Sequence, residues 1–215
     1  MNLFSTFDPS TGYLSMNWMS MFTLMIAFPM KLWMKNGSNS TISISIMIKL
    51  HKEMKQISNN KGFSLIFNSL FMMILMNNMM GLIPYIFTAS AQMSFSLPIA
   101  LSLWMASMIM GWTKKTNKMF AHMVPMGTPK ILMPLMIIIE SISNIMRPGS
   151  LSVRLTANMI AGHLIMSLLG NSVSNFKTML MIIIIMMMLM MFELAVSMIQ
   201  SYVFMTLSSL YSSEI

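Results

Sequence analysis

Long apolar runs separated by short polar stretches dominate the sequence. A helix that crosses a bilayer needs about 20 mostly apolar residues, because each residue adds about 1.5 Å along the helix axis. The pattern therefore predicts an all-α integral membrane protein, with about five membrane-embedded helices in a single membrane domain. The runs that reach the required length cover residues 13–34, 63–87, 93–112, 132–169 and 178–210.

The segment 37–60 has a different pattern. Serines alternate with isoleucines at its start, and basic residues interrupt its second half. A basic amphipathic helix of this kind lies in the plane of the membrane interface. The sequence thus predicts one surface amphipathic segment, although the alternation of Ser and Ile is also typical of a short strand.

The last two apolar runs are longer than a perpendicular span requires. Residues 132–169 would extend for about 57 Å as one helix, whereas the hydrocarbon core of a bilayer is about 30 Å thick. This segment is either one strongly tilted helix or two spans. We expect 132–169 and 178–210 to form a hairpin of two long tilted helices. A shorter hairpin, 63–87 with 93–112, is closed by the turn TASAQ, and the stretch around TKKTNK is expected to be a loop.

Composition narrows the class of protein. Of the 215 residues, 56% are hydrophobic and only 8% are charged, against about 25% charged in soluble domains, which excludes a water-soluble enzyme. The absence of Cys excludes disulfides, thiolate metal sites and cysteine nucleophiles. Three His and five acidic residues are scattered along the chain, and no GxxxxGK[ST] motif for nucleotide phosphates is present. We therefore expect no metal, no cofactor and no active site of its own.

The net charge of +8 comes mostly from lysines between the apolar runs. This placement is typical of loops that set membrane topology, and not of a surface that binds nucleic acid. If the N-terminus lies outside and each run crosses once, ten lysines share the inner side and only Lys177 lies on the outer side. The positive-inside rule favours this topology. The inner lysines are Lys31, Lys35, Lys49, Lys52, Lys55, Lys61, Lys114, Lys115, Lys118 and Lys130.

The N-terminus, MNLFSTFDPSTGY, has neither a basic region nor an Arg-rich pattern, so it resembles neither a secretory signal nor a transit peptide. We expect a chain made in the compartment where it works. The 35 Met residues replace Ile and Leu throughout the apolar runs. Packing alone does not require so many flexible side chains, which indicates a coding bias such as that of an animal organelle genome.

Polar and ionisable side chains interrupt the long run 132–169. Such residues are costly at membrane depth and indicate a functional site. On a helix of 3.6 residues per turn, each of these side chains points within about 40° of the direction of the first one, Glu140. Together they form one polar stripe. The stripe consists of Glu140, Asn144, Arg147, Arg154 and Asn158.

A second polar face follows on 178–210, where Glu193, Ser197 and Gln200 are spaced by four and three residues. Two polar stripes on a helical hairpin indicate an ion path. An unpaired carboxylate among the apolar neighbours of Glu193 would take up a proton or find a partner. His163 lies about 180° from Arg154 around the helix, so a core imidazole satisfied by the protein is the alternative there.

Other polar positions leave two interpretations open. Arg147 precedes Pro148-Gly149 and could extend to the interface instead of lining a path. Asn77 and Asn78 could be packing residues between helices or ligands.

The string VRLTANMIAGHL, residues 153–164, resembles subunit a of the rotary F-type ATP synthase in its mitochondrial version, also called ATPase subunit 6. The resemblance rests on Arg154, an Asn four residues later, an Ala-Gly pair and an ionisable residue nine after the Arg. Glu140, Glu193, Gln200 and the strings NLFSTFDP and NNMMGLIPY support it. Many bacterial members of the family carry Glu where this chain has His163 and His where it has Glu193. Compared with them, the acid and the imidazole have exchanged helices in this chain, as in mitochondrial relatives.

The resemblance implies a stator wall against which a ring of c subunits rotates, each with a buried carboxylate. Arg154 would face that ring and separate two proton half-channels. The inlet from the intermembrane space would be lined by His163, Glu193, Asn158 and Gln200, and the outlet to the matrix by Glu140.

The resemblance also implies a location and partners. The chain would be a multi-pass protein of the mitochondrial inner membrane, with its N-terminus on the intermembrane-space side and its Lys-rich loops in the matrix. Its partners would be the ring, the other membrane and peripheral-stalk subunits and the lipid bilayer, without nucleic acid.

Two other classes also place charged residues in a membrane. A secondary transporter or a proton-translocating subunit of a respiratory complex is the main alternative, but transporters usually show inverted repeats and none is apparent. A purely structural membrane anchor would not need Arg154 and Glu193 at depth.

Overall fold

Helices make up nearly all of the computed structural model, which describes residues 7–10, 15–22, 38–57, 61–83, 86–124, 129–173 and 176–214. No strand is present in these ranges. Four helices are long and apolar enough to cross a membrane: α3, α4, α6 and α7. The prediction of an all-α integral membrane protein is therefore confirmed. In chain order the elements are η2 (Met16–Phe22), α2 (Ser38–Ile57), α3 (Lys61–Gly81), η3 (Ala89–Ala91), α4 (Met93–Lys114), α5 (Thr116–His122), α6 (Met133–Asn171) and α7 (Phe176–Glu214).

The first predicted span, 13–34, lies mostly outside the described residues. Of this run, the described part comprises residues 15–22, in which Met16–Phe22 forms the 3-10 helix η2. Ser20 donates a hydrogen bond to the backbone oxygen of Phe87 over 3.3 Å, and Trp18 packs edge-on against the Phe87 ring. These contacts hold η2 against the segment that precedes η3. A membrane span over 13–34 stays a prediction.

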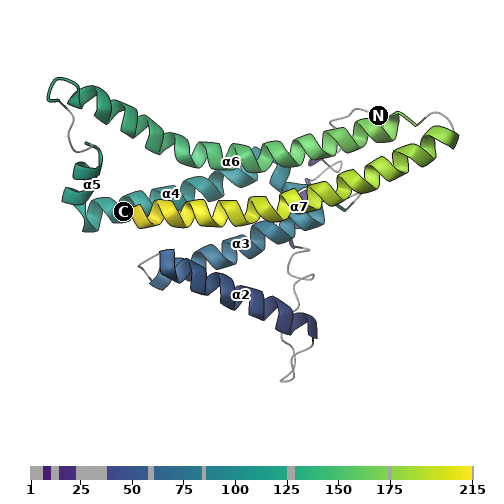
Figure 1. Ribbon diagram of the computed structural model, residues 1–215, viewed down its shortest axis with the longest axis horizontal. Coiled ribbons are helices and arrows are strands. Elements are labelled where there is room, and N and C mark those ends of the chain that lie inside the picture. Colours follow the sequence, from purple (N-terminus) through teal and green to yellow (C-terminus); the bar gives the residue numbers. More distant parts are fainter. Residues whose placement is uncertain are drawn as a thin grey trace.

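The long hairpin consists of α6, along the upper edge of the view, and α7, through its middle; the two lie side by side toward the end of α6 and separate toward its beginning (Figure 1). Each has 39 residues and would be about 58 Å long if straight. The run 132–169 is thus one helix and not two spans. Figure 1 shows that α6 is bowed. Pro148 lies inside it, and a proline that removes one backbone hydrogen bond accounts for such a bend without ending the helix.

The shorter helices pack against the long pair, α3 mainly on α7 and α4 mainly on α6. One apolar core joins all four helices and consists of Ile74, Ala100, Leu151, Leu155 and Phe204. A second core ties α2 to the bundle through Met54, which is fully buried with Phe67, Phe71 and Met205.

The segment predicted as surface amphipathic is helical as α2, and the strand alternative does not apply. Its exposed residues include Lys49, Lys52 and Lys55, together with Ile44 and Ile46. A helix that is fixed by Met54 on one side and exposes both lysines and isoleucines fits a position at a membrane interface.

Two predicted boundaries differ from the structure. The span 63–87 ends at Gly81, where the turn bonds Leu82 N to Met79 O (3.3 Å) and Ile83 N to Met80 O (3.1 Å) close the helix. Ile83 precedes a proline in the sequence, and that position disfavours helical backbone. The stretch expected to be a loop contains the short helix α5 (Thr116–His122), because TNKMFAH has no helix-breaking residue.

Candidate functional site

The most deeply buried acidic side chain among the described residues is Glu193, in the middle of α7. It is only 8% exposed, and neither carboxylate oxygen has a hydrogen-bond partner in the part of the chain that the structure describes. Across from it lies Gly162 of α6. A Cβ atom on Gly162 would lie 2.7 Å from both Cδ and Oε1 of Glu193, closer than real Cβ contacts. The missing side chain at residue 162 therefore makes room for the carboxylate.

The next residue on α6, His163, is half-buried between three segments. Its imidazole hydrogen-bonds to the backbone of Gly81 at the end of α3. The ring of Phe7 meets it edge-on, with ring centroids 6.1 Å apart. Nε2 is buried and has no partner among the described residues. The simple alternative of a core imidazole with both nitrogens satisfied therefore does not hold within the described chain.

The N-terminal segment is fixed over His163 by hydrogen bonds. Gln92 Nε2 donates to the backbone oxygen of Phe7 over 2.7 Å, and Asn17 Nδ2 donates to that of Asp8 over 3.2 Å. The backbone N–H of Ser10 donates to the Asp8 carboxylate over 3.0 Å, and this bond lowers the pKa of Asp8. A negative charge is thus kept next to the contact between Phe7 and His163.

Several buried polar atoms without a partner among the described residues belong to the last part of α3, to η3 and the residue before it, and to the first turn of α4, in addition to α6 and α7. Contacts place the end of α3 beside this site: Ser197 donates to Met79 Sδ over 3.6 Å, and a Cβ on Gly81 would meet Thr88 and Met159. Buried polar groups without a protein partner are normally satisfied by water, so this region has the chemistry of a hydrated path. Besides His163 and Glu193, the side chains concerned are Asn77, Asn78, Thr88, Ser90 and Ser96.

Arg154 lies elsewhere on α6 and is exposed. It lines a shallow depression with Gln200 of α7, so the structure brings these two predicted residues together. No described carboxylate lies within 4.0 Å of its guanidinium. Exposed apolar side chains directly precede both residues in the sequence, Val153 on α6 and Ile199 on α7. A positive charge on an apolar face is complementary to a partner that brings a negative charge.

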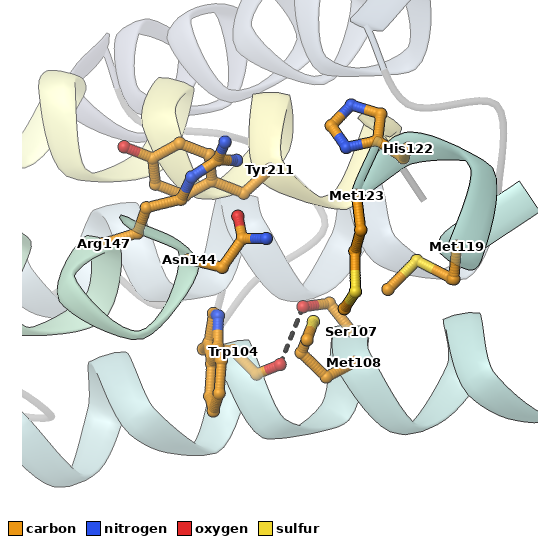
Figure 2. A pocket seen from close by; sticks show the side chains of 9 residues that line it. All are labelled: Trp104, Ser107, Met108, Met119, His122, Met123, Asn144, Arg147 and Tyr211. Atoms are coloured by element: carbon orange, nitrogen blue, oxygen red, sulfur yellow. Dashed lines mark hydrogen bonds between the residues drawn. The ribbon is translucent and has the colours of Figure 1, made fainter. Parts of the chain in front are cut away.

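The basic end of the stripe forms a separate group. Arg147 Nη2 lies 4.0 Å from Glu140 Oε1, and the guanidinium lies 4.9 Å above the ring of Tyr211. Figure 2 shows Arg147 and Asn144 facing a pocket between α4, α5, α6 and α7. Arg147 is thus packed between Glu140 and Tyr211 beside this pocket. The polar stripe thus divides into an outer site at Arg154 and a pocket at Arg147.

Several residues of this site were not predicted from the sequence. They are Phe7, Gly81, Thr88, Gln92 and Gly162, the last of which lies close to Glu193. A glycine inside a long apolar helix indicates a close approach, so Gly162 carried a detectable signal. The other residues come together at this site only because distant segments of the chain fold against one another. Asn158 is half-buried, and Glu140 lies about 35 Å along α6 from His163. Within the described ranges, no group of three His, Cys, Asp or Glu could hold a metal ion.

Comparison with known proteins gives consistent similarities over the whole chain. The family profile described as ATP synthase A chain matches residues 13–213. ATP synthase subunit a of Drosophila simulans is 50% identical over 220 residues, which cover 100% of this chain and 98% of the relative. The protein of the same name from Anopheles gambiae is 48% identical with the same coverage, and that of Locusta migratoria is 48% identical over 221 residues.

Proposed function

This chain belongs to the ATP synthase A chain family, and from that premise we propose that it supplies two proton half-channels to a rotating c-subunit ring and separates them with Arg154. It is a subunit of the membrane sector of the mitochondrial ATP synthase and a multi-pass protein of the inner membrane. This membership decides against a secondary transporter or a subunit of another respiratory complex. The chain takes part in proton transport for ATP synthesis, and catalysis on nucleotides belongs to other subunits.

The buried polar cluster around Glu193 is the observation that carries the proposal. The carboxylate of Glu193 and Nε2 of His163 have no protein partner in the described chain, and the same holds for amide and hydroxyl groups on α3, η3 and α4, which pack against α6 and α7. Groups that both accept and donate protons, hydrated inside an apolar bundle, are what a proton inlet requires. Asn158 and Gln200 continue the inlet along α6 and α7 toward Arg154. The inlet opens toward the intermembrane space, on the side of the N-terminus.

Arg154 acts as the barrier between the half-channels. Its guanidinium stays charged at all relevant pH values, so it cannot relay a proton itself. Exposed on an apolar face beside Gln200, it attracts a deprotonated carboxylate on the ring and keeps the two channels electrically separate. Protons must therefore travel with the ring. Each proton that crosses 100 mV supplies about 2.3 kcal/mol, so one ATP requires several protons.

Glu140 marks the outlet at the other end of α6. It is 31% exposed and lies near the beginning of α6, at the same end of the bundle as the exposed lysines Lys114, Lys115 and Lys118. By the positive-inside rule this end faces the matrix. A partly exposed carboxylate there collects protons that leave the ring and passes them to water.

The test is substitution of Arg154 in the assembled synthase. Arg154→Ala should abolish proton-driven ATP synthesis, leave the complex assembled and raise passive proton leak. Arg154→Lys should fail as well, because a desolvated amine can lose its proton and lacks the planar guanidinium. Lys118→Ala, which removes an exposed cation from α5, is the matched control and should keep coupling. Wild-type coupling in the Arg154→Ala synthase would contradict the proposal.

A further inference from the structure

Phe7, in the N-terminal segment, lies against the imidazole of His163. The two rings meet edge-on, with centroids 6.1 Å apart and an interplanar angle of 89°. An edge-on arrangement is one that aromatic rings prefer. The contact brings a residue from near the beginning of the chain against the last third of α6. A side chain without any polar group therefore touches a residue of the proposed proton inlet.

The backbone of Phe7 is anchored to the corner between η3 and α4. Gln92 Nε2 donates a hydrogen bond to the backbone oxygen of Phe7 over 2.7 Å. The backbone N–H of Gln92 donates to Ala89 O over 3.1 Å, and its carbonyl accepts from the N–H of Phe95 over 3.1 Å. Gln92 thus ends η3 and begins α4, and its side chain starts from a backbone that is fixed on both sides.

The next residue has an anchor of its own. Asn17 Nδ2 donates to the backbone oxygen of Asp8 over 3.2 Å. Asn17 belongs to η2, in which Trp18 packs edge-on against Phe87 with ring centroids 5.6 Å apart. Two amide side chains from different segments therefore hold two consecutive carbonyl groups. This double attachment fixes the place of the Phe7 ring beside α6.

The imidazole of His163 has few other restraints. It hydrogen-bonds to the backbone of Gly81, and Nε2 is buried without a partner among the described residues. A backbone bond at one ring nitrogen leaves the other nitrogen to exchange protons. Rotation of the side chain would break the bond to Gly81 or move Nε2 out of its buried place. A neighbouring ring at a fixed place opposes that rotation.

We propose that Phe7 is a positioning residue of the proton inlet. Held by Gln92 and Asn17, its ring keeps the imidazole of His163 in the one orientation that leaves Nε2 buried and ready to exchange protons. This role rests on the proposed function, in which His163 carries protons. Phe7 itself neither binds nor releases a proton.

Acylation by diethyl pyrocarbonate tests the contact independently of proton transport. The reagent reacts with unprotonated imidazole nitrogens that it can reach, and the modified residues of the intact synthase in vesicles are identified by mass spectrometry. The chain has three histidines, of which His122 on α5 is exposed and provides the internal reference. Phe7→Ala should raise acylation of His163 relative to His122 by about two- to tenfold, which corresponds to about 0.5–1.5 kcal/mol for an edge-on aromatic pair. An unchanged ratio would overturn the proposal.

The rate of ATP synthesis per assembled complex tests the role of the ring. Phe7→Ala should slow proton-driven synthesis by a similar factor. Phe7→Leu keeps an apolar side chain without the ring and should remain slow. Phe7→Tyr keeps the ring and should restore both the rate and the protection of His163. Leucine can replace a residue that only fills space, so a wild-type rate in Phe7→Leu would contradict a positioning role.

Two variants leave the Phe7 side chain unchanged. Gln92→Leu removes the donor to Phe7 O and should raise acylation of His163, although less than Phe7→Ala does. Wild-type acylation in Gln92→Leu would contradict the anchoring by this amide. Phe120→Ala is the matched control, because it removes a ring that lies 5.9 Å from Trp112 at the other end of α4. It should change neither acylation nor rate, and effects as large as those of Phe7→Ala would overturn the proposal.

His163→Gln separates a failure of this proposal from a failure of the proposed function. If the His163→Gln synthase makes ATP at the wild-type rate, the inlet does not pass through His163 and the proposed function is wrong at this point. If His163→Gln is slow, whereas Phe7→Ala exposes His163 and keeps the wild-type rate, the inlet stands and the positioning role of Phe7 is wrong.

Discussion

At Gly162 the backbone of α6 comes close to the carboxylate of Glu193. An alanine there would place Cβ 2.7 Å from Cδ and Oε1, and a contact that short forces one partner to move. The partner is the end of a flexible side chain, so the carboxylate moves and the helices stay in place. We therefore expect Gly162→Ala to slow proton-driven ATP synthesis by about ten- to a hundredfold, the scale for a functional group displaced by about 1 Å.

Gly170 provides the matched control for this prediction. It lies on the same helix, and a Cβ atom there would meet nothing within 4 Å. Gly170→Ala should assemble and synthesise ATP at the wild-type rate. The measurement is the rate of ATP synthesis per assembled complex in the same vesicles. Equal rates in both variants would show that the position of the Glu193 carboxylate does not matter for conduction.

Glu140→Gln should have a milder effect. The carboxylate is partly exposed, and water can replace it in a wide outlet, so we expect a loss of less than about tenfold, below the usual range for a buried acid–base group. The rate should also become less dependent on the pH of the matrix side. Stability should change little, because its 4.0 Å contact with Arg147 is long and partly exposed to solvent, and such pairs are worth about 0–1 kcal/mol. An unchanged rate and an unchanged pH profile would show that Glu140 is structural.

At the scale of elements, the length of the apolar runs predicted where the long helices lie. In lipid the backbone polar groups must bond to one another, and a single apolar segment achieves this only as a helix. The run 132–169 became α6 (Met133–Asn171), but its continuity could not be predicted. Pro148 and Gly149 in the middle could have separated two spans. Packing of Leu151 and Leu155 into the core just beyond the proline holds the bowed helix together instead.

Part of the site was not predictable because it depends on contacts between distant elements. Polar residues in apolar runs pointed to Arg154, His163 and Glu193 because each is costly in a membrane. The cover of His163 by Phe7 depends on a hydrogen bond between Gln92 and the backbone of Phe7, 85 positions apart. No pattern of neighbouring residues indicates a contact across so large a separation in the sequence. It arises only when η3 is packed between α3, α4 and α6.

This connection leads to a prediction about the N-terminal segment. Gln92→Leu keeps the size of the side chain and removes the amide that donates to Phe7 O over 2.7 Å. A net hydrogen bond is worth about 1 kcal/mol, so backbone amides of residues 7–10 should exchange hydrogen about fivefold faster in the assembled synthase. Asn117→Leu, which changes an exposed amide of α5, should leave their exchange unchanged. Unchanged exchange in Gln92→Leu would show that other contacts hold the segment.

At the scale of the whole molecule, polar and apolar surfaces are inverted relative to a soluble protein. The hydroxyl groups of Ser90, Ser152, Ser197 and Ser201 belong to residues that are 0–1% exposed, whereas Phe192 is 68% exposed. In water such a chain would aggregate, because exposed apolar area is unfavourable there. In a bilayer, small polar residues let helices approach, and the apolar exterior faces lipid or another membrane subunit. The bundle thus directs its polar groups inward, where His163 and Glu193 lie.

The exchange of His163 and Glu193 tests whether these two residues act as one unit. They come from different long helices, and Gly162, which touches Glu193, is the chain neighbour of His163. If a water connects imidazole and carboxylate, they titrate together, and which helix holds which group matters little. His163→Glu and Glu193→His alone place two acids or two imidazoles at the site, so each should reduce conduction strongly. The double exchange should recover a substantial part of proton-driven ATP synthesis. The three variants are compared per assembled complex in the same membranes. A double variant no faster than the slower single would show that the residues are uncoupled and that the inlet follows another route.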